Sequence, residues 1–411
     1  MRRGVYGGGL VGLWAAMAIL GGALTSCDRG VSPPPPRRPV RAEDLQSTDI
    51  LPHMDGPIVP GRNYVYCGSF QLAWNLLQDV VLKGRVLLKG DPPMAAALNA
   101  QVFRRSDLSE GSYLAMVGKP SDGIVDRIRT AMAARFPQAG VDVPDAEADE
   151  VFYAFAYLEK VLTFREPFER VTEPLAFHAA AGEARVACFG IDLSRPGSYD
   201  RRRAILQQVT VLSYKNDDDF VLRLLTTSQD DELLLAKIPR QATLAATVQA
   251  AWERIRWQET PRPPLERGVS YDEAPADYPG GPGAYVADRV RELREQGYLF
   301  GAAIERDEPL KIPLVALNAV REYSEVTKTG LLNPGWEAYY LKAATQGVRF
   351  QLNEYGAVLR SWARVTTAGG PPIAPRRFVF DKPFLVCLTQ KGAKAPYFAL
   401  WVESAEVLEK R

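Results

Sequence analysis

The sequence predicts an α+β fold in which a long series of short strands is surrounded by fewer helices. Most apolar runs of the body are β-branched or aromatic segments of strand length, whereas helical periodicity is confined to four places. The strands and helices do not alternate regularly, which favours α+β over α/β architecture. No internal repeat occurs, so a solenoid or propeller is not expected.

The first 27 residues have the pattern of an export signal. Arg2 and Arg3 precede a mostly apolar run, residues 10–24, that is shorter than the roughly 20 residues needed to span a bilayer. Small residues follow and end at Cys27, which resembles the lipobox of bacterial lipoproteins. The resemblance implies a signal peptide over residues 1–26 and lipid attachment on Cys27. An ordinary signal peptide that contains a cysteine is the alternative.

Residues 27–50 are expected to form a proline-rich tether, because four consecutive prolines favour a stiff polyproline II segment. The folded domain is then expected over residues 51–411. The lipid would hold this domain at a bacterial cell envelope, facing the periplasm or the exterior. The sequence leaves the membrane and the leaflet open.

Composition excludes several classes of partner. The net charge is +1, so nothing indicates nucleic-acid binding. Apart from Cys27, the cysteines are Cys67, Cys188 and Cys387; one disulfide among them stays open, and no CxxC pair indicates zinc. We expect a monomer without a metal or a cofactor.

The strands are expected at segments rich in β-branched and aromatic residues. A hairpin is expected where two such segments flank the turn 215–219, whose acidic triplet is interpreted as a solvated turn rather than a calcium loop. The expected strands cover residues 151–157, 209–212, 220–225, 233–238, 314–317, 348–352 and 384–388.

The helices are expected where apolar residues recur every three or four positions. These segments are residues 70–82, 124–136, 243–255 and 285–296. Residues 259–300 are expected to contain a long irregular insertion, because proline, glycine and acidic residues dominate its first part.

Motifs for catalysis are lacking, so an enzyme is not expected. His53 and His178 have no obvious nucleophile partner, and a structural role is their simplest interpretation. The sequence contains no G-x-S-x-G elbow, no glycine-rich phosphate loop and no H-E-x-x-H motif.

The C-terminal third carries the strongest motifs. Phe380-Asp381-Lys382-Pro383-Phe384-Leu385, followed by Tyr397 to Val402, resembles the closing strands of serpins. Upstream, Asn353-Glu354-Tyr355-Gly356-Ala357 resembles the serpin hinge, and 23 residues separate Gly356 from Phe380. Weaker similarities at residues 63–76, 157–168, 221–239 and 310–331 follow in the family's order. The resemblance implies three β-sheets with surrounding helices and a long exposed reactive-centre-like loop.

The resemblance also implies a mechanism and its residues. In this family a protease cleaves the loop, which then inserts into the large sheet with the enzyme attached. The hinge would comprise Glu354, Gly356, Ala357 and Leu359. From Ala357 to Thr367, apolar or small residues alternate with Val358, Arg360, Trp362, Arg364 and Thr366, a period of two that suits insertion as a half-buried strand. An ordinary strand continuing the preceding one is the alternative.

Other features count against trapping. Leu359, Arg360 and Trp362 are bulky for a hinge. The family interval places the scissile bond near Gly370-Pro371, where proline blocks most serine proteases; Arg364, Arg376 and Arg377 are alternative targets. The family's polar residues of the large sheet correspond to Ala154, Leu162 and Gln346, which predicts the loss of a hydrogen-bonded latch.

Two functions therefore remain open. The first is a lipid-anchored inhibitor of a serine or cysteine protease at the cell envelope, whose target the sequence does not name. The second is a non-inhibitory binding or structural protein with the same fold.

Overall fold

The computed structural model describes residues 39–137, 153–160, 162–194, 199–259, 274–295, 304, 307–341, 343–356, 376–393 and 395–410. Cys27 and the tether up to residue 38 lie outside these residues. So do Ala357, Leu359, Arg364, Gly370 and Pro371.

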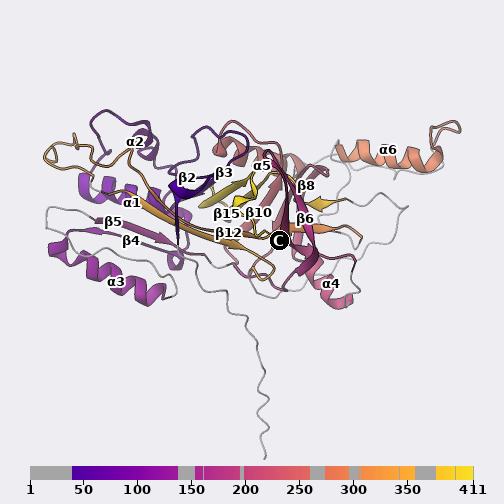
Figure 1. Ribbon diagram of the computed structural model, residues 1–411, viewed down its shortest axis with the longest axis horizontal. Coiled ribbons are helices and arrows are strands. Elements are labelled where there is room, and N and C mark those ends of the chain that lie inside the picture. Colours follow the sequence, from indigo (N-terminus) through magenta and orange to yellow (C-terminus); the bar gives the residue numbers. More distant parts are fainter. Residues whose placement is uncertain are drawn as a thin grey trace, which may run out of the picture. The chain divides into compact units, whose positions relative to one another are not determined.

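A seven-stranded sheet forms the centre of the fold, in the order β2-β3-β16-β15-β10-β9-β8 (Figure 1). It joins the predicted hairpin to the predicted C-terminal strands. Along the chain its strands are β2 (Thr48–Leu51), β3 (Asn63–Cys67), β8 (Val209–Asn216), β9 (Asp219–Leu224), β10 (Asp231–Lys237), β15 (Phe384–Gln390) and β16 (Phe398–Val402).

A four-stranded sheet has the order β14-β11-β7-β6 and comprises β6 (Glu169–Ala179), β7 (Gly182–Ile191), β11 (Leu310–Pro313) and β14 (Phe378–Val379). The long β6–β7 hairpin was not predicted, because polar residues interrupt its apolar pattern. Gly190 lets β7 approach β11: a Cβ there would lie 1.9 Å from the carbonyl oxygen of Leu310.

The remaining strands form two separate groups. One is the order β1-β12-β13, with β1 (Val40–Arg41), β12 (Val315–Glu322) and β13 (Thr345–Leu352). The other is the pair β4 (Tyr113–Gly118) and β5 (Tyr153–Leu158). Strand β1 and all of β2 but Leu51 lie within the residues predicted as tether, so the folded chain begins earlier than expected. Both strands are too short to show periodicity in the sequence.

The helices confirm the α+β class. They are α1 (Ser69–Leu76), continued by a π-helix (Leu77–Leu82), then α2 (Pro93–Leu98), α3 (Ile124–Arg135), α4 (Tyr199–Leu206), α5 (Leu244–Glu259) and α6 (Gly281–Glu295). Four of them, α1, α3, α5 and α6, match the predicted helices. Helix α6 begins at Gly281, so it also includes residues 281–284 of the segment predicted as irregular.

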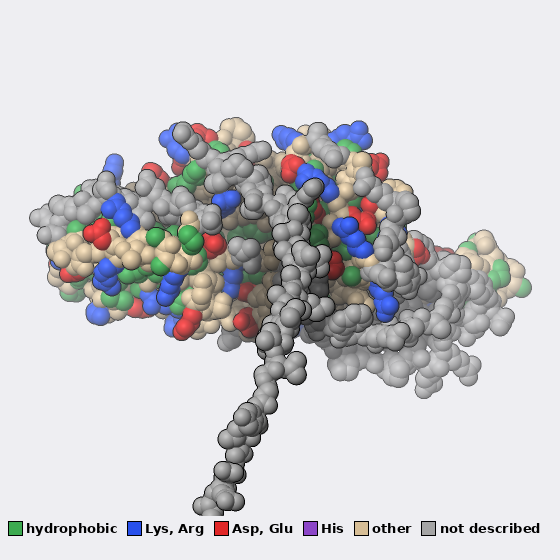
Figure 2. Space-filling model, turned by 90° about the horizontal axis from the view of Figure 1, so that it is seen from below, with side chains coloured by type: hydrophobic (Ala, Val, Ile, Leu, Met, Phe, Trp, Pro, Cys, Tyr) green, Lys and Arg blue, Asp and Glu red, His purple; other side chains and the backbone are tan. Residues whose placement is uncertain are grey.

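The main hydrophobic core lies between the seven- and four-stranded sheets, and α5 covers a second core on the other face of the larger sheet. Among the described residues, Cys67, Cys188 and Cys387 are buried and form no disulfide. No described helix is long and apolar enough to cross a membrane. Figure 2 shows basic and acidic side chains intermixed on the described part of one face, in keeping with the net charge of +1.

Candidate functional site

The candidate site is built around two strands that each leave one edge unpaired among the described residues. Strand β5 pairs with β4, and β13 pairs with β12. Helix α1 packs against β4, β5 and β13, so it supports both groups from the same side. One of the three expected sheets is therefore divided here into two parts.

The two faces of β5 have different environments. Ala154 packs with side chains of α1, whereas Tyr153, Phe155 and Tyr157 pack with α3. Figure 1 shows α1 and α3 on opposite sides of β4 and β5. Burial raises the pKa of Tyr157, the Glu159 carboxylate acts in the same direction, and Arg349 on β13 opposes them.

The segments that follow β5 and β13 are joined by backbone hydrogen bonds. The amide of Phe164 donates to the carbonyl of Tyr355 at 3.0 Å, and that of Phe168 donates to the carbonyl of Glu354 at 2.9 Å. The segment that follows β5 therefore lies beside the segment that follows β13, directly before the residues that begin the predicted loop.

Glu354 is the buried residue of the predicted hinge. Its side chain is 8% exposed, and its Oε1 lies 3.4 Å from Nη1 of Arg170, which is 40% exposed and also contacts Glu409. The second carboxylate oxygen, Oε2, is buried without a hydrogen-bond partner among the described residues. Gly356 follows, and a Cβ at this position would lie 3.1 Å from the ring of Phe164. The hinge is therefore packed closely but paired incompletely.

The far end of the predicted loop is held differently. Arg376 forms a two-pronged ion pair with Glu308, with Nε–Oε1 at 2.6 Å and Nη2–Oε2 at 2.8 Å. Their side chains are 5% and 4% exposed. The guanidinium also lies against the rings of Tyr214 and Phe378. Arg376 was predicted as an alternative protease target, but this burial makes it a poor one in the intact fold.

The acidic turn at residues 217–219 supports this far end, instead of being only a solvated turn. Lys237 is buried and contacts Asp218 at 2.8 Å and Asp381 at 2.6 Å. The amide of Arg377 donates to Asp217 at 3.2 Å. The pKa of Asp218 is lowered: burial alone would raise it, but Lys237 and Lys382 outweigh that effect. These contacts explain the acidic triplet without a metal ion.

Gln346 provides a hydrogen-bonded latch that the sequence predicted to be lost. Its Nε2 donates to the carbonyl of Cys67 at 2.8 Å and to Oγ of Ser69 at 3.0 Å. Its Oε1 accepts from the hydroxyl of Tyr323 at 2.7 Å. The amide of a glutamine supplies both a donor and an acceptor, so it ties β13 to the start of α1.

The described residues contain no group of His, Cys, Asp and Glu side chains arranged to hold a metal ion. His53 is half-buried; burial lowers its pKa, although Asp55 acts in the opposite direction. His178 lies 3.6 Å from Glu183 on the neighbouring strand. Neither histidine is joined to the hinge residues by a described contact. The sequence missed Arg170 and Glu308, and it named Gln346 without its hydrogen-bonding role, because these roles depend on partners far away in the chain.

No protein-family model matches the sequence, and no curated protein is significantly similar to it. Solved structures with a similar arrangement include thyroxine-binding globulin in complex with thyroxine, at 8% identity and a TM-score of 0.42, covering 84% of this chain and 94% of the globulin. A highly specific serpin of the insect Tenebrio molitor is 11% identical, with a TM-score of 0.41 and coverage of 83% and 92%. Human glycosylated kallistatin is also 11% identical, with a TM-score of 0.40 and coverage of 84% and 92%. These values describe a distant likeness and establish no shared activity.

Proposed function

We propose that the chain is a serpin-like protein that presents residues 357–375 to a serine or cysteine protease. The observation that carries the proposal is the contrast between the two ends of this segment. Its far end is held by the buried ion pair of Arg376 and Glu308. Its hinge follows β13 which, like β5, has one edge unpaired among the described residues. Cleavage within 357–375 would separate these ends. The part attached to Gly356 could then enter between β5 and β13, each of which pairs with a single strand among the described residues.

The alternation of side chains supports insertion in one register. On β13, Gln346, Val348 and Leu352 are buried, whereas Thr345, Gly347, Arg349 and Gln351 are exposed. An inserted strand must match this alternation, since successive side chains point to opposite faces. The side facing the core would take the residues with apolar or small side chains. We call these residues the small face: Ala357, Leu359, Ser361, Ala363, Val365 and Thr367.

A protease panel tests this proposal. The chain from Asp28 onward, which keeps every described residue, is incubated with serine and cysteine proteases and analysed by denaturing electrophoresis. We expect a covalent complex that survives denaturation. Cleavage without such a complex, for every protease tested, would contradict trapping.

Matched variants separate insertion from recognition. Ala363→Arg places a charge on the small face and should convert trapping into simple cleavage, because a buried unpaired charge is costly. Trp362→Arg places the same charge on the opposite face and should leave trapping intact. Equal effects of the two variants would argue against insertion in this register.

Non-inhibitory binding is the second candidate, favoured by the bulky Leu359 and Trp362 and by the Gly370-Pro371 centre. It predicts that cleavage leaves the melting temperature nearly unchanged, since no strand is added.

Anchoring through lipid on Cys27 belongs to the same proposal. It is supported by the apolar run before Cys27 and the small residues beside it. Labelling bacterial cultures with a radioactive fatty acid should mark the parent chain and fail to mark Cys27→Ser. Equal labelling of both chains would exclude Cys27 as the attachment site.

A further inference from the structure

Two loops, one before α2 and the other between β12 and β13, form an exposed apolar surface at the other end of β13 from the hinge. Leu88 and Leu331 form an antiparallel bridge, flanked by hydrogen bonds from Lys89 to Gly330 at 2.9 Å and from Leu332 to Leu87 at 2.8 Å. Gly330 bridges in turn to Tyr340, and the amide of Leu331 donates to Tyr339 at 2.9 Å. Three short segments are thus held side by side.

This pairing sorts the side chains onto two faces. Leu88 and Leu331 point inward and are 3% and 5% exposed. Their neighbours Leu87 and Leu332 are 46% and 54% exposed, and Tyr340 is 55% exposed. The register puts Leu87, Leu332 and Tyr340 on the same outer face, because side chains alternate along paired strands.

The same face carries positive charge. Arg85 and Lys89 are exposed and share the alternation of Leu87, so they flank its side chain. The two segments, 83–91 and 328–341, also contain Lys83 and Lys328, both exposed. Their carboxylates, Asp91 and Glu337, lie outside the paired positions. We call the outer surface of Arg85, Leu87, Lys89, Leu332 and Tyr340 the Tyr340 face.

We propose that the Tyr340 face binds an anionic membrane surface. Exposed leucines and a tyrosine beside lysine and arginine match the interface of an anionic bilayer, where apolar groups enter the headgroup layer and cations meet phosphate. A rigid pairing of three segments also presents these groups without an ordering cost at binding. The proposal rests on this composition and geometry, and holds whether or not a protease is trapped.

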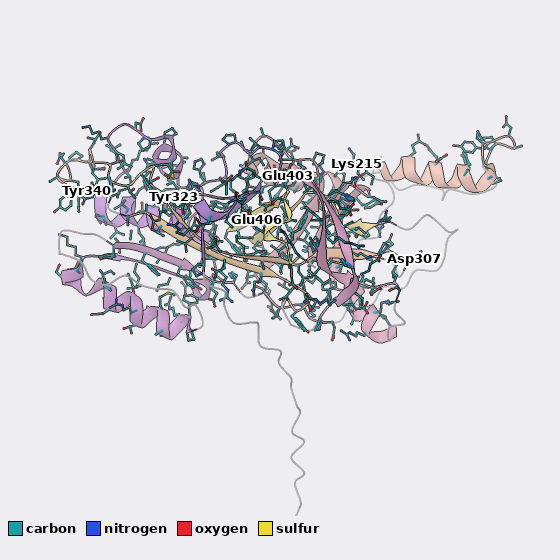
Figure 3. The ribbon with its side chains drawn as sticks, in the orientation of Figure 1. Lys215, Asp307, Tyr323, Tyr340, Glu403 and Glu406 are labelled. Carbon is teal, nitrogen blue, oxygen red and sulfur yellow. The ribbon has the colours of Figure 1, made fainter. Side chains whose placement is uncertain are left out.

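The position of the Tyr340 face determines where the two ends of the predicted loop would lie relative to a bound membrane. Strand β13 runs from Thr345, just after this face, to Leu352, just before Glu354. Eight residues of strand span about 26 Å. Figure 3 shows Tyr340 and Asp307, the neighbour of Glu308, far apart on opposite sides of the view. A membrane bound at the Tyr340 face would therefore leave both loop ends turned toward the solution.

Vesicle flotation tests the proposal with the chain from Asp28 onward, which lacks Cys27. Vesicles of phosphatidylcholine with one-third phosphatidylglycerol should carry the chain upward, and pure phosphatidylcholine should carry much less. Raising the ionic strength from about 0.05 M to about 0.5 M should weaken binding, because exposed charges are screened. Absence of binding to the anionic vesicles would overturn the proposal.

Variants locate the contact. Leu332→Ser and Tyr340→Ser should each weaken binding about fivefold or more, and Lys89→Gln about fivefold, since one cation near an anionic surface contributes about 1 kcal/mol. Tyr355→Ser is the matched control, because Tyr355 is 46% exposed at the opposite end of β13. Equal losses at Tyr340 and Tyr355 would overturn the assignment. So would self-association without vesicles that Leu332→Ser abolishes, which would make a second copy the occupant.

Discussion

The two ends of the predicted loop are held by ion pairs of different quality. Arg376 and Glu308 are both almost completely buried and share two hydrogen bonds between their side chains. Arg170 beside Glu354 is 40% exposed, and one oxygen of the Glu354 carboxylate has no hydrogen-bond partner among the described residues. Burial strengthens the interaction of charges and makes the loss of one partner costly. The comparison indicates a fixed far end and a releasable hinge, the asymmetry that insertion after cleavage requires.

The far end gives the largest expected effect. Arg376→Ala leaves the Glu308 carboxylate buried without its cation, so it should lower the free energy of unfolding by about 3–5 kcal/mol. Urea unfolding followed by circular dichroism measures the change. Arg377→Ala is the matched control, because Arg377 is exposed and bonds Asp217 through its backbone amide. A loss below about 1 kcal/mol for Arg376→Ala would show that the far end is not fixed by this pair.

Removing the hydrogen bonds of Gln346 should have an intermediate effect on the free energy of unfolding. Gln346→Leu keeps the volume of the side chain but leaves the Tyr323 hydroxyl and the Cys67 carbonyl unpaired, at a cost of about 2–3 kcal/mol. Gln351→Leu, on an exposed position of the same strand, should cost less than about 0.5 kcal/mol. If both variants unfold at the same urea concentration, the Gln346 network does not stabilise β13.

Removing the charge of Glu354 in the hinge should lower the free energy of unfolding only slightly, and its effect should be confined to the neighbouring amides. Glu354→Gln weakens the contact with the half-exposed Arg170 and should cost about 1 kcal/mol or less. Hydrogen exchange of the amides of Phe164 and Phe168 should accelerate, since they donate to the carbonyls of Tyr355 and Glu354. Glu409→Gln, on the same arginine, should leave these amides unchanged. If these two amides exchange at the same rate in Glu354→Gln as in the parent chain, the Glu354 carboxylate does not hold the hinge in place.

The smallest expected effect on stability is the loss of the Glu406 contribution at acid pH. Burial would raise the pKa of Glu406, but hydrogen bonds from Thr48, Gln46 and Ser47 outweigh it, so the pKa is lowered in the folded state. Its contribution to stability is therefore present above the unfolded pKa, about 4.3, and is lost as the pH falls through the folded value. Figure 3 shows Glu406 near the middle of the described unit.

Unfolding in urea at neutral and acid pH checks this prediction. Glu406→Gln should reduce the difference between the two conditions, and the control variant Glu43→Gln, at an exposed position shortly before β2, should not. An unchanged difference in Glu406→Gln would show that the strand β2 is not held by the Glu406 carboxylate.

The sequence predicted the elements whose signals are local. The hairpin around residues 215–219 and the C-terminal strands have continuous apolar patterns, and α1 and α5 have clear helical periodicity. The β6–β7 hairpin was missed because Arg170, Glu173 and Arg185 interrupt its pattern. The start of the folded unit was placed too late, since β1 and β2 form only through pairing with β12 and β3.

The candidate site was predictable only in part. Glu354 and Gly356 could be named from a short motif, but the partner of Glu354 lies 184 residues away in sequence. Arg376 was predicted as an alternative protease target, because nothing in the glycine- and proline-rich sequence before it indicates that its side chain is buried. Its partner Glu308 lies 68 residues upstream, so only the folded chain shows the pair.

The melting temperature before and after a single cleavage within residues 357–375 tests the central claim most directly. Insertion between β5 and β13 would add a strand paired on both edges. We predict a rise of about 10 °C or more, since each added kcal/mol moves the melting temperature by about 2 °C in a large domain. A cleaved chain that melts at the temperature of the intact one would contradict insertion and leave binding without trapping as the function of the loop.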